Sequence, residues 1–432
     1  MLELIDGRDQ LTPVYVARPK AAPGPGGRGL EEHVSGIVDD VRLRGDAALL
    51  EYTERFDGVR LAPDDIAVDR MTISNARKLV RPELIDALEV MAERLRRTCE
   101  RQRIDTWLEP SVDEATGELV RPLRRVGAYV PGGRAAYPSS VVMAVVPAQV
   151  AGVEGICVCS PPGRNGEMSE AVLAACDVLG VTEVYRMGGA QAIAALAYGT
   201  ATVRPVEKIV GPGNAYVTRA KRLVQGWVGI DSEAGPTEIA IVADETADAA
   251  VVAADLVAQA EHGPLGSHVL ITWAPELIDR VNAQLEIAVA RHERPDDVEN
   301  ALIEGGRAVL VRDVKQAMET SNAFAPEHLE LLFAGAMAAL EDVRNAGAVF
   351  VGAFSPVSAG DYVAGTNHVL PAGGTARWSA GLTTRDFVKT IYVSSLEQTA
   401  LTRLAPHVDA LAQAEGLEAH ARAVRARLGR TL

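Results

Sequence analysis

Cysteine is scarce in this chain, and no spacing pairs the few that are present. The four cysteines among 432 residues are Cys99, Cys157, Cys159 and Cys176. Cys157 and Cys159 do not form a CxxC motif, and on a strand both would face the same side. A disulfide framework is typical of secreted proteins. We therefore expect Cys157 and Cys159 to be reduced and packed in a core, without a catalytic role.

Positive charge and long apolar runs are also in short supply. Lys and Arg number 43 against 58 Asp and Glu, which gives a net charge of −15. Nucleic acid is therefore not an expected partner, because its phosphates require basic side chains. Residues 141–153 form the most apolar stretch, but it is too short to span a bilayer and includes Pro147. The acidic start, MLELIDGRDQ, does not resemble a signal peptide. We expect a cytoplasmic protein with no membrane partner.

The chain is long for a single core and suits two or three domains. We expect residues 1–20 to form an arm and the Pro/Gly-rich residues 21–29 to form a linker. Apolar side chains at helical spacing predict that residues 30–56 and 74–104 are helical. These first hundred residues show no obvious chemistry.

From residue 127 onward, predicted strands alternate with predicted helices. The first run has strands at 156–158, 183–185 and 208–210 and helices at 168–179, 190–198 and 215–224. The second run has helices at 247–260, 275–289 and 314–322 and strands at 268–271, 308–311 and 348–351. Such alternation predicts parallel sheets with right-handed crossovers, and two runs of similar size predict a cleft between them.

An acid and an imidazole stand side by side in the stretch Asn322–Leu331, NAFAPEHLEL. Adjacent side chains on a strand point to opposite faces, so Glu327 and His328 can serve one site only from a turn or the end of an element. Enzyme sites favour such positions. The alternative interpretation is a surface Glu-His pair.

Two glycine-rich loops are candidates for binding a nucleotide. Gly211-Pro212-Gly213-Asn214 begins like the dinucleotide fingerprint GxGxxG, but Tyr216 replaces the third glycine. Backbone N–H groups at the start of the following helix would still suit a pyrophosphate. Residues 127–140, GAYVPGGRAAYPSS, could cover a ring or a phosphate. Ordinary tight turns remain the alternative for both loops. The sequence has no GxxxxGK[ST] motif, which argues against a P-loop nucleotidase.

Metal-ligand chemistry is a sharper signal. Gln259 and His262 are three residues apart near the end of a predicted helix, so both project from one face. The glycine-rich residues 352–368, expected to be a loop after a strand, contain Asp361 and His368.

A further acid and imidazole lie near the C-terminus. Glu415 and His420 would diverge on an unbroken helix, but a break at Gly416 would bring them together. Two imidazoles, one carboxylate and one amide oxygen would make a mixed zinc site with a position open for substrate.

Several blocks together resemble one known family, the histidinol dehydrogenases. In chain order the matching blocks are VGAYVPGGRAAYPSS, RMGGAQAIAALAYGT, VEKIVGPGNAYVTRAK, GIDSEAGPTEIAI, AQAEHGP, NAFAPEHLEL, SAGDYVAGTNHVLP and AEGLEAHA. They cover roughly residues 30–425. One departure is Thr237, where the family commonly has serine; the hydroxyl is kept.

The resemblance implies a role for each matching position. The zinc ligands would be Gln259, His262, Asp361 and His420. The acid-base residues would be Glu327 and His328, and the NAD contacts would be Tyr129, Gln191 and Asn214. The substrate contacts would be Thr237, Gln259, His262, His328, Asp361, His368, Glu415 and His420.

The resemblance also implies an architecture. Two incomplete Rossmann-like units, similar to those of aldehyde dehydrogenases, would be flanked by smaller pieces. The parts would be an arm at 1–27, a first α/β domain with the zinc and acid-base residues at 28–126 and 238–378, a second α/β domain on the NAD side at 127–237, and a helical segment at 379–432. In a homodimer this last segment would complete the partner's site.

The activity that the resemblance implies is a four-electron, NAD-dependent oxidation of L-histidinol to L-histidine through a bound aldehyde. Three rivals stay open. One is a relative acting on another amino alcohol or polyol, which would not need His368, Glu415 or His420. The others are a zinc hydrolase and a non-catalytic binding module. Both make poor use of two α/β units whose loops carry so many polar functional groups.

Overall fold

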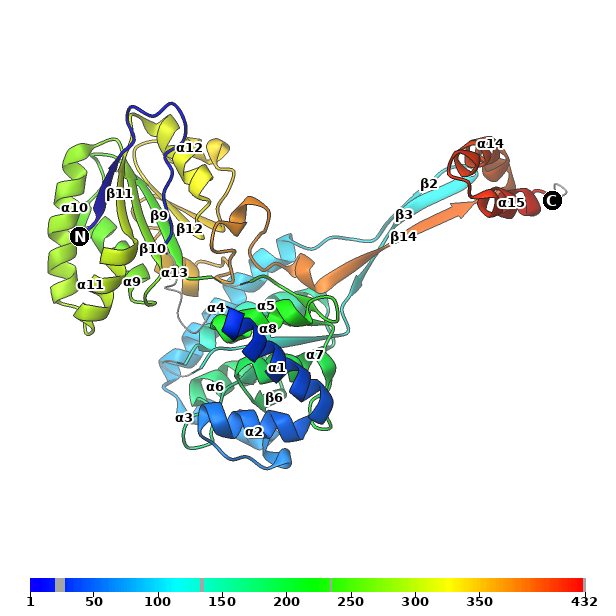
Figure 1. Cartoon of the computed structure of the whole chain (residues 1–432), viewed down its shortest axis with the longest axis horizontal. Helices are drawn as coiled ribbons and strands as arrows, with labels where there is room; N and C mark the ends of the chain where they lie inside the picture. Colours follow the sequence, from blue (N-terminus) through cyan, green and yellow to red (C-terminus); the bar gives the residue numbers. More distant parts are fainter. Residues whose placement is uncertain (20–27, 133–135, 234, 430–432) are drawn as a thin grey trace.

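The computed structural model describes residues 1–19, 28–132, 136–233 and 235–429. Within these ranges, two parallel sheets form the centres of two α/β units, and an antiparallel ribbon extends away from both (Figure 1). Sheet A has the strand order β1-β11-β10-β9-β12-β13, and sheet B has the order β6-β5-β4-β7-β8. Every strand pair in these two sheets is parallel, which confirms the fold predicted from the alternation.

The sheet A unit carries helices on both faces. Its strands are β1 (Glu3–Asp6), β9 (Glu238–Ala243), β10 (Ser267–Thr272), β11 (Gly306–Leu310), β12 (His328–Leu332) and β13 (Ala348–Val351). Its helices are α9 (Ala249–Ala260), α10 (Pro275–Ala290), α11 (Pro295–Gly305), α12 (Val314–Phe324) and α13 (Val357–Tyr362). Along β9, Ile239 and Ile241 belong to one apolar cluster and Ala240 and Val242 to another. A strand buried on both faces is expected in a parallel sheet.

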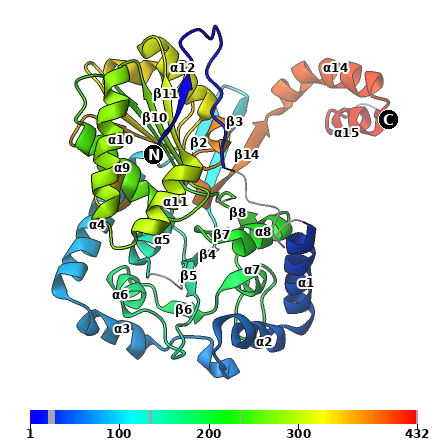
Figure 2. The same cartoon turned by 60° about the vertical axis from the view of Figure 1, so that its left-hand side comes forward.

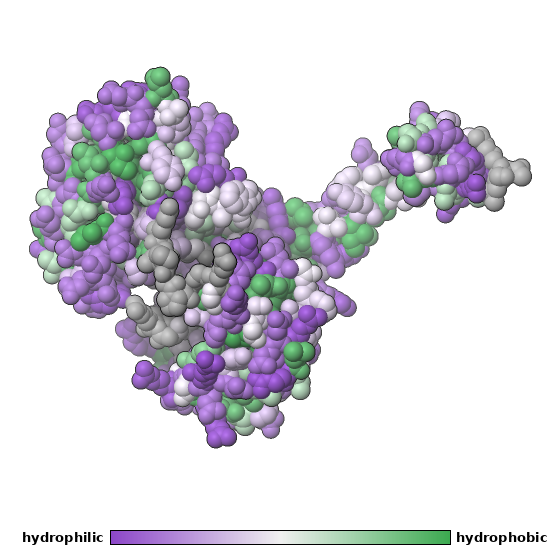
Figure 3. Space-filling view, in the orientation of Figure 1, coloured by the Kyte–Doolittle hydropathy of each residue, from purple (hydrophilic) through white to green (hydrophobic). Residues whose placement is uncertain are grey.

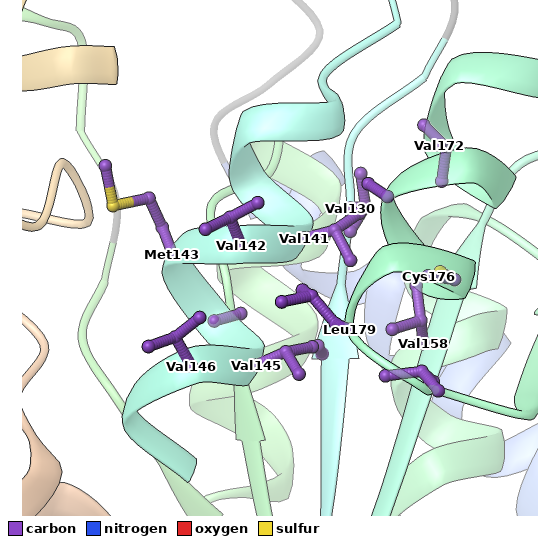
Figure 4. Packing of buried hydrophobic residues seen from close by; sticks show 14 of the residues in the cluster. Val130, Val141, Val142, Met143, Val145, Val146, Val158, Val172, Cys176 and Leu179 are labelled. Carbon is purple, nitrogen blue, oxygen red and sulfur yellow. The ribbon is translucent and has the colours of Figure 1, made fainter. Parts of the chain in front are cut away.

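The sheet B unit is built in the same way. Its strands are β4 (Arg125–Tyr129), β5 (Gly155–Ser160), β6 (Glu183–Arg186), β7 (Lys208–Val210) and β8 (Gly229–Ile230). Its helices include α5 (Pro138–Ala151), α6 (Glu170–Val178), α7 (Gly189–Tyr198) and α8 (Ala215–Val224). Figure 4 shows Val141 and Val145 of α5 in the same cluster as Val158 and Cys176. A helix that is apolar on all sides must be buried, as α5 is. All four cysteines are buried and unpaired, as expected for packing residues.

The helices of residues 28–101 pack on the sheet B unit. They are α1 (Arg28–Arg44), α2 (Asp46–Asp57), α3 (Arg70–Leu79) and α4 (Pro82–Arg101). In the structure α1 packs on α7 and α8, α3 on α6, and α4 on α5 (Figure 2). The expected grouping of residues 28–126 with 238–378 is therefore corrected. Apolar side chains at helical spacing predict a helix, but they do not identify the surface against which it packs.

The N-terminal residues are part of the sheet A unit. Strand β1 pairs with β11, and Val14 and Val16 are buried in an apolar cluster of that unit. The expected arm at 1–20 is thus integrated as far as residue 19. Most of the predicted linker at 21–29 lies outside the described residues, and its last two residues begin α1.

An antiparallel ribbon projects from the two units and carries a pair of helices at its tip (Figure 1). The ribbon consists of β2 (Trp107–Pro110), β3 (Glu114–Pro122) and β14 (Val388–Leu396), and the helices are α14 (Gln398–Ala414) and α15 (Glu418–Arg427). The C-terminal segment, expected to be helical, therefore also contains a nine-residue strand. Short 3₁₀ turns complete the elements: η1 (Pro63–Asp65), η2 (Ala338–Asp342), η3 (Thr375–Arg377) and η4 (Thr384–Phe387). In the described part of the chain, every helix is too short or too polar to cross a bilayer.

Several apolar side chains of the ribbon and of the helices at its tip are exposed to solvent. Tyr392 is 83% exposed, Trp107 47% and Leu411 65%. Figure 3 shows apolar surface along the ribbon where it leaves the two units. Several exposed apolar side chains on one projecting element are typical of a protein interface.

Candidate active site

A cavity of about 290 Å³ lies between the two units, and residues of both line it. The sheet A unit contributes Gln259, His262, Glu327, His328 and Asp361, whereas the sheet B unit contributes Ser139, Ser140 and residues Gly211–Gly213. The predicted cleft thus exists, and it gathers most of the predicted site residues: Thr237, Gln259, His262, Glu327, His328, Asp361 and His368.

His328 is the first residue of β12 and is buried to 4% exposure. Its Nδ1 lies 2.9 Å from the carbonyl oxygen of Glu238, and because a carbonyl only accepts, Nδ1 carries the proton. Nε2 therefore has a free lone pair and makes no hydrogen bond with the described residues. Burial lowers the pKa of His328, so the ring is neutral near pH 7. A neutral imidazole with a free Nε2 is equipped to accept a proton.

Glu327 lies immediately before β12. The two neighbouring side chains are therefore at the end of an element, as expected if both serve one site. Its Oε2 accepts hydrogen bonds of 2.9 Å from the Thr237 hydroxyl and of 2.9 Å from the backbone N–H of Glu238. Burial nevertheless raises the pKa of Glu327 to about 8. A carboxyl group with a pKa near neutrality is suited to general acid-base catalysis.

The Thr237 hydroxyl links Glu327 to Gln259. It donates to Glu327 and accepts a hydrogen bond from the amide Nε2 of Gln259. The amide nitrogen of Gln259 also lies 3.4 Å from Nδ1 of His328, which leaves Oε1 of Gln259 as the atom available to a metal ion. A serine at position 237 would offer the same hydroxyl group, so the threonine conserves this bridge.

Gln259, His262 and Asp361 supply an amide oxygen, an imidazole and a carboxylate to the same cavity. Gln259 is near the end of α9, and His262 follows that helix directly. Asp361 is on the short helix α13 instead of in the expected loop. Burial raises the pKa of Asp361. The nearby imidazole of His328, and then that of His262, act to lower this pKa, so both rings are close to Asp361. The described residues nevertheless include no group of three His, Cys, Asp or Glu side chains that could hold a metal ion.

This donor set fits three positions of the predicted zinc site. Amide oxygen, imidazole nitrogen and carboxylate oxygen are all ordinary zinc ligands. The fourth predicted ligand, His420, is on the exposed tip helix α15 and is not brought to this cavity. A zinc site made from the predicted ligands therefore requires an imidazole from another chain.

His368 faces the cavity from the loop after α13. Its Nδ1 donates to the carbonyl oxygen of Asp361 over 3.0 Å, and its Nε2 lies 3.4 Å from the hydroxyl of Ser140. Burial lowers the pKa of His368 to about 4, so the ring is neutral. Next to it, the amide of Asn367 donates to the carbonyl oxygen of Met143 in α5. This loop therefore joins the two units at the site.

A larger cavity of about 1290 Å³ lies in the sheet B unit, and Pro131 lines both cavities. The three predicted NAD contacts, Tyr129, Gln191 and Asn214, all line it. The side-chain oxygen of Gln191 is buried and has no hydrogen-bond partner in the described structure, so it can accept a bond from a ligand. Asn214 caps α8 by accepting the N–H groups of Tyr216 and Val217, and its amide nitrogen stays available.

Comparison of the sequence with known proteins finds relatives that share one name. The family model described as histidinol dehydrogenase matches residues 26–428. The histidinol dehydrogenase of Synechococcus sp. is 47% identical over 399 residues, which cover 92% of each chain. That of Thermobifida fusca is 48% identical over 406 residues, again 92% of each chain.

The chain belongs to the histidinol dehydrogenase family. The fold agrees with this assignment. The crystal structure of histidinol dehydrogenase from Elizabethkingia anophelis is 34% identical and superposes with a TM-score of 0.91 over 99% of this chain and 98% of that one. The protein is therefore an oxidoreductase of a family named for histidinol, and the hydrolase and the non-catalytic module are set aside.

Two predicted substrate contacts of the histidinol dehydrogenase site lie far from the cavity. Glu415 ends α14 and His420 is in the first turn of α15, both exposed at the tip of the ribbon (Figure 1). Gly416 between the helices has a φ of 71°, a left-handed conformation that favours glycine. The predicted break at Gly416 is confirmed, and it brings Glu415 and His420 to the same end of the helix pair.

Sequence reasoning missed two ion pairs that support the site, one partly buried and one fully buried. Arg18 forms an ion pair with Glu238 and donates to the carbonyl oxygen of Phe324 over 2.6 Å. This contact ties the N-terminal strand region to both β9 and the segment before Glu327. The Arg18–Glu238 pair spans 220 residues, and no local pattern identifies such a pair.

Lys221 and Asp231 form the second pair. Lys221 also donates to the carbonyl oxygen of Gly211 over 3.0 Å, and Asp231 accepts the N–H of Gly211 over 2.7 Å. Gly211 has a φ of 111°, and a Cβ there would collide with the carbonyl oxygen of Tyr129. The pair therefore holds the glycine loop between the two cavities. A lysine in the middle of a glycine-led helix is a sequence signal that could have suggested this role.

Proposed function

We propose that this protein oxidises L-histidinol to L-histidine in two NAD-dependent steps, through L-histidinaldehyde that stays bound. One observation carries the proposal: the cavity with His328, Glu327 and the three converging metal-ligand candidates adjoins, at Pro131, the larger cavity lined by Tyr129, Gln191 and Asn214. A reacting carbon in the first cavity and a nicotinamide ring entering from the second would meet at this junction.

The chain's own groups divide the proton transfers. Nε2 of His328 accepts the hydroxyl proton of the alcohol as hydride leaves the carbon, because Nδ1 is already bonded to the carbonyl oxygen of Glu238. Glu327 removes a proton from the water that attacks the aldehyde, and its raised pKa makes it an effective base near neutrality. The resulting hydrate can lose the second hydride.

Gln259, His262 and Asp361, with His420 of the partner subunit, would hold one zinc ion per site. When bound, zinc supplies a charge that fixes the imidazole and amine of the substrate, and NAD supplies the hydride acceptor. His368 of the same chain and Glu415 of the partner subunit would contact the substrate. Thr237 keeps Gln259 and Glu327 in place through the hydrogen bonds of its hydroxyl group.

We infer that the working form is a homodimer with shared sites, in the cytoplasm. The exposed apolar side chains of the ribbon and the distance of His420 and Glu415 from the cavity support this inference. A ribbon that packs against a second chain would bury these apolar side chains and place His420 and Glu415 at the partner's cavity. Two-fold symmetry would make the exchange mutual.

The test is the formation of NADH when purified protein is incubated with L-histidinol and NAD. We expect activity that a strong chelator removes and that added Zn²⁺ restores. Other amino alcohols and polyols serve as comparison substrates. Faster turnover of any of them than of histidinol would favour the alternative of a relative with another substrate. No NADH from any of these alcohols would contradict the proposal.

A further inference from the structure

Helix α2 ends against the larger cavity, in the part of the chain where the sequence shows no obvious chemistry. Its last two residues, Phe56 and Asp57, line the cavity together with Tyr129, Gln191 and Asn214. The helix packs on α1 and α7 and so belongs to the sheet B unit (Figure 2). Residues 28–101 therefore provide one wall of the cavity.

Asp57 stands out because its half-buried carboxylate is not fully paired among the described residues. One of its oxygens is shielded from solvent and makes no hydrogen bond with the described residues. No neighbouring cation or donor offsets the burial, which alone raises the pKa of Asp57 to about 6. A shielded carboxylate oxygen without a hydrogen-bond donor is costly, and such an atom in a cavity usually meets its partner in a ligand.

The surroundings of Asp57 define the chemistry of that ligand. The carboxylate needs a ligand that donates hydrogen bonds without carrying negative charge nearby. The charged side chains of the described cavity wall are those of Asp57, Glu167, Glu170 and Arg164, so carboxylates outnumber the guanidinium. A vicinal diol satisfies the first need, and a phosphate monoester at the same place would be repelled.

Aromatic rings indicate which end of a dinucleotide lies there. Phe56 is 46% exposed and Tyr216 is 44% exposed, and both line the cavity. The ring of His33 lies 6.2 Å from each of them, so the two rings belong to one aromatic cluster. Aromatic faces suit an adenine ring. In the proposed function the nicotinamide ring lies at the Pro131 junction between the two cavities. The aromatic cluster would therefore contact the adenosine half of NAD.

We propose that Asp57 binds the hydroxyl groups of the adenosine ribose and thereby selects NAD over NADP, an inference that rests on the proposed function. The carboxylate accepts hydrogen bonds from the 2′- and 3′-hydroxyls. The 2′-phosphate of NADP removes one donor and adds charge beside the carboxylate. An acidic residue plays the same part in other dinucleotide folds, although there it follows the glycine fingerprint by about 20 residues. Here it precedes every glycine loop of the sheet B unit.

The test compares the binding of NAD and NADP to the wild type, Asp57→Asn and Glu54→Gln. Glu54 is an exposed acid of the same helix outside the cavity, so Glu54→Gln is a matched control for charge. We expect Asp57→Asn to weaken NAD binding about tenfold and to lower the NAD-over-NADP preference at least as much, in line with the typical strength of hydrogen bonds to charged groups. Glu54→Gln should change neither affinity more than about twofold, because a solvent-exposed charge outside the cavity interacts weakly with a bound ligand.

An NAD analogue with 2′-deoxyadenosine tests the hydroxyl itself. The wild type should bind it about tenfold more weakly than NAD, whereas Asp57→Asn should distinguish the two by less than about threefold. Thermal unfolding checks the variant's fold. We expect a midpoint no lower than that of the wild type, because a buried unpaired charge is removed. Asp57→Ser replaces Asp57→Asn if the midpoint falls.

Two outcomes would overturn this inference: an unchanged NAD preference in Asp57→Asn, or equal losses for NAD and the deoxy analogue. Binding is measured without histidinol, so the result does not depend on turnover. If the wild type oxidises histidinol but Asp57→Asn leaves the preference for NAD unchanged, only the role of Asp57 is refuted. Asp57-dependent NAD binding without histidinol oxidation would refute only the proposed function.

Discussion

At the scale of single residues, burial and hydrogen bonding determine which side chain can accept a proton. The Glu238 carbonyl fixes the tautomer of His328, and burial keeps that ring neutral. Burial of Glu327 raises its pKa to about 8 although two donors oppose the shift. The backbone of Glu238 thus contacts both adjacent side chains, and the two residues can take the separate tasks proposed for them.

The first prediction separates those tasks. Glu327→Gln should slow the aldehyde step far more than the alcohol step, because only the aldehyde step needs an activated water. His328→Asn should slow both steps. General acid-base groups typically contribute about 10²–10⁴-fold, so single-turnover assays that start from histidinol and from histidinaldehyde can resolve the difference. Equal damage to both steps by Glu327→Gln would refute the division.

The second prediction concerns the Thr237 hydroxyl. Thr237→Val keeps the shape of the side chain but leaves the Gln259 amide and Glu327 without their shared partner. An unsatisfied buried polar group costs about 1–3 kcal/mol, so we expect kcat/KM for histidinol to fall roughly tenfold or more. Thr237→Ser is the matched control and should stay within about threefold of the wild type. Similar losses in both variants would mean that the methyl group matters more than the hydroxyl.

At the scale of secondary-structure elements, strand ends and helix ends place the site. β12 begins at His328, α9 ends just before His262, and α8 begins after Asn214. The short helix α13, which carries Asp361, is held by Glu330 of β12, whose side chain accepts the N–H of Val357 over 3.0 Å. Glu330 is fully buried, and Asp255 of α9 is close enough for its charge to raise the pKa of Glu330.

The third prediction follows from the closeness of these two carboxyl groups. Burial first, and then the charge of Asp255, raise the pKa of Glu330 above its usual 4.5. The folded state therefore binds more protons than the unfolded state, and stability falls as the pH rises above about 4.5 towards the folded pKa. The fall is at most about 1.4 kcal/mol per pH unit for one proton.

Glu330→Gln should remove this contribution. The variant should be more stable than the wild type at pH 8 relative to pH 5, as measured by chemical denaturation of the chelator-treated protein. Asp297→Asn, at an exposed site on α11, controls for a simple change of net charge. The same pH dependence in Glu330→Gln and the wild type would show that Glu330 is not protonated in the folded state.

The elements also show where sequence reasoning succeeds. Glu327 and His328 had to lie at an element end to share a site, and the break at Gly416 followed from the spacing of Glu415 and His420. These inferences needed only local geometry. Strand β14 was missed, although the run Thr390-Ile391-Tyr392-Val393 is rich in β-branched and aromatic residues. Its partner β3 is about 270 residues away in the chain, so no hairpin signal joins them.

At the scale of the whole molecule, long-range packing determines what the sequence alone could not. The helices of residues 28–101 pack on the sheet B unit, and the Arg18–Glu238 pair joins the N-terminal region to β9. The ribbon holds Glu415 and His420 far from the cavity of their own chain (Figure 1). Side chains that the proposed function assigns to one site are therefore distributed over distant parts of the molecule.

The fourth prediction is that two inactive variants restore activity when combined. Glu327→Gln damages the cavity side of a site, and His420→Ala damages the tip side. In a mixed dimer with shared sites, one site carries both lesions and the other carries neither. Co-refolding should therefore recover up to about half of the wild-type activity per mixed dimer.

Glu327→Gln combined with His328→Asn is the matched negative control, because both lesions lie on the cavity side and neither site is spared. Native mass spectrometry establishes that mixed dimers have formed. Mixed dimers of Glu327→Gln and His420→Ala without recovered activity would show that each chain builds its own site.

The most direct test of the central claim is the stoichiometry of complete turnover. A limiting amount of L-histidinol is converted with excess NAD, and NADH, histidine and free aldehyde are measured together. The account predicts two NADH and one histidine for each histidinol, with no aldehyde released, because Glu327 and His328 serve both oxidations in one cavity. One NADH for each histidinol, with histidinaldehyde accumulating in solution, would contradict it.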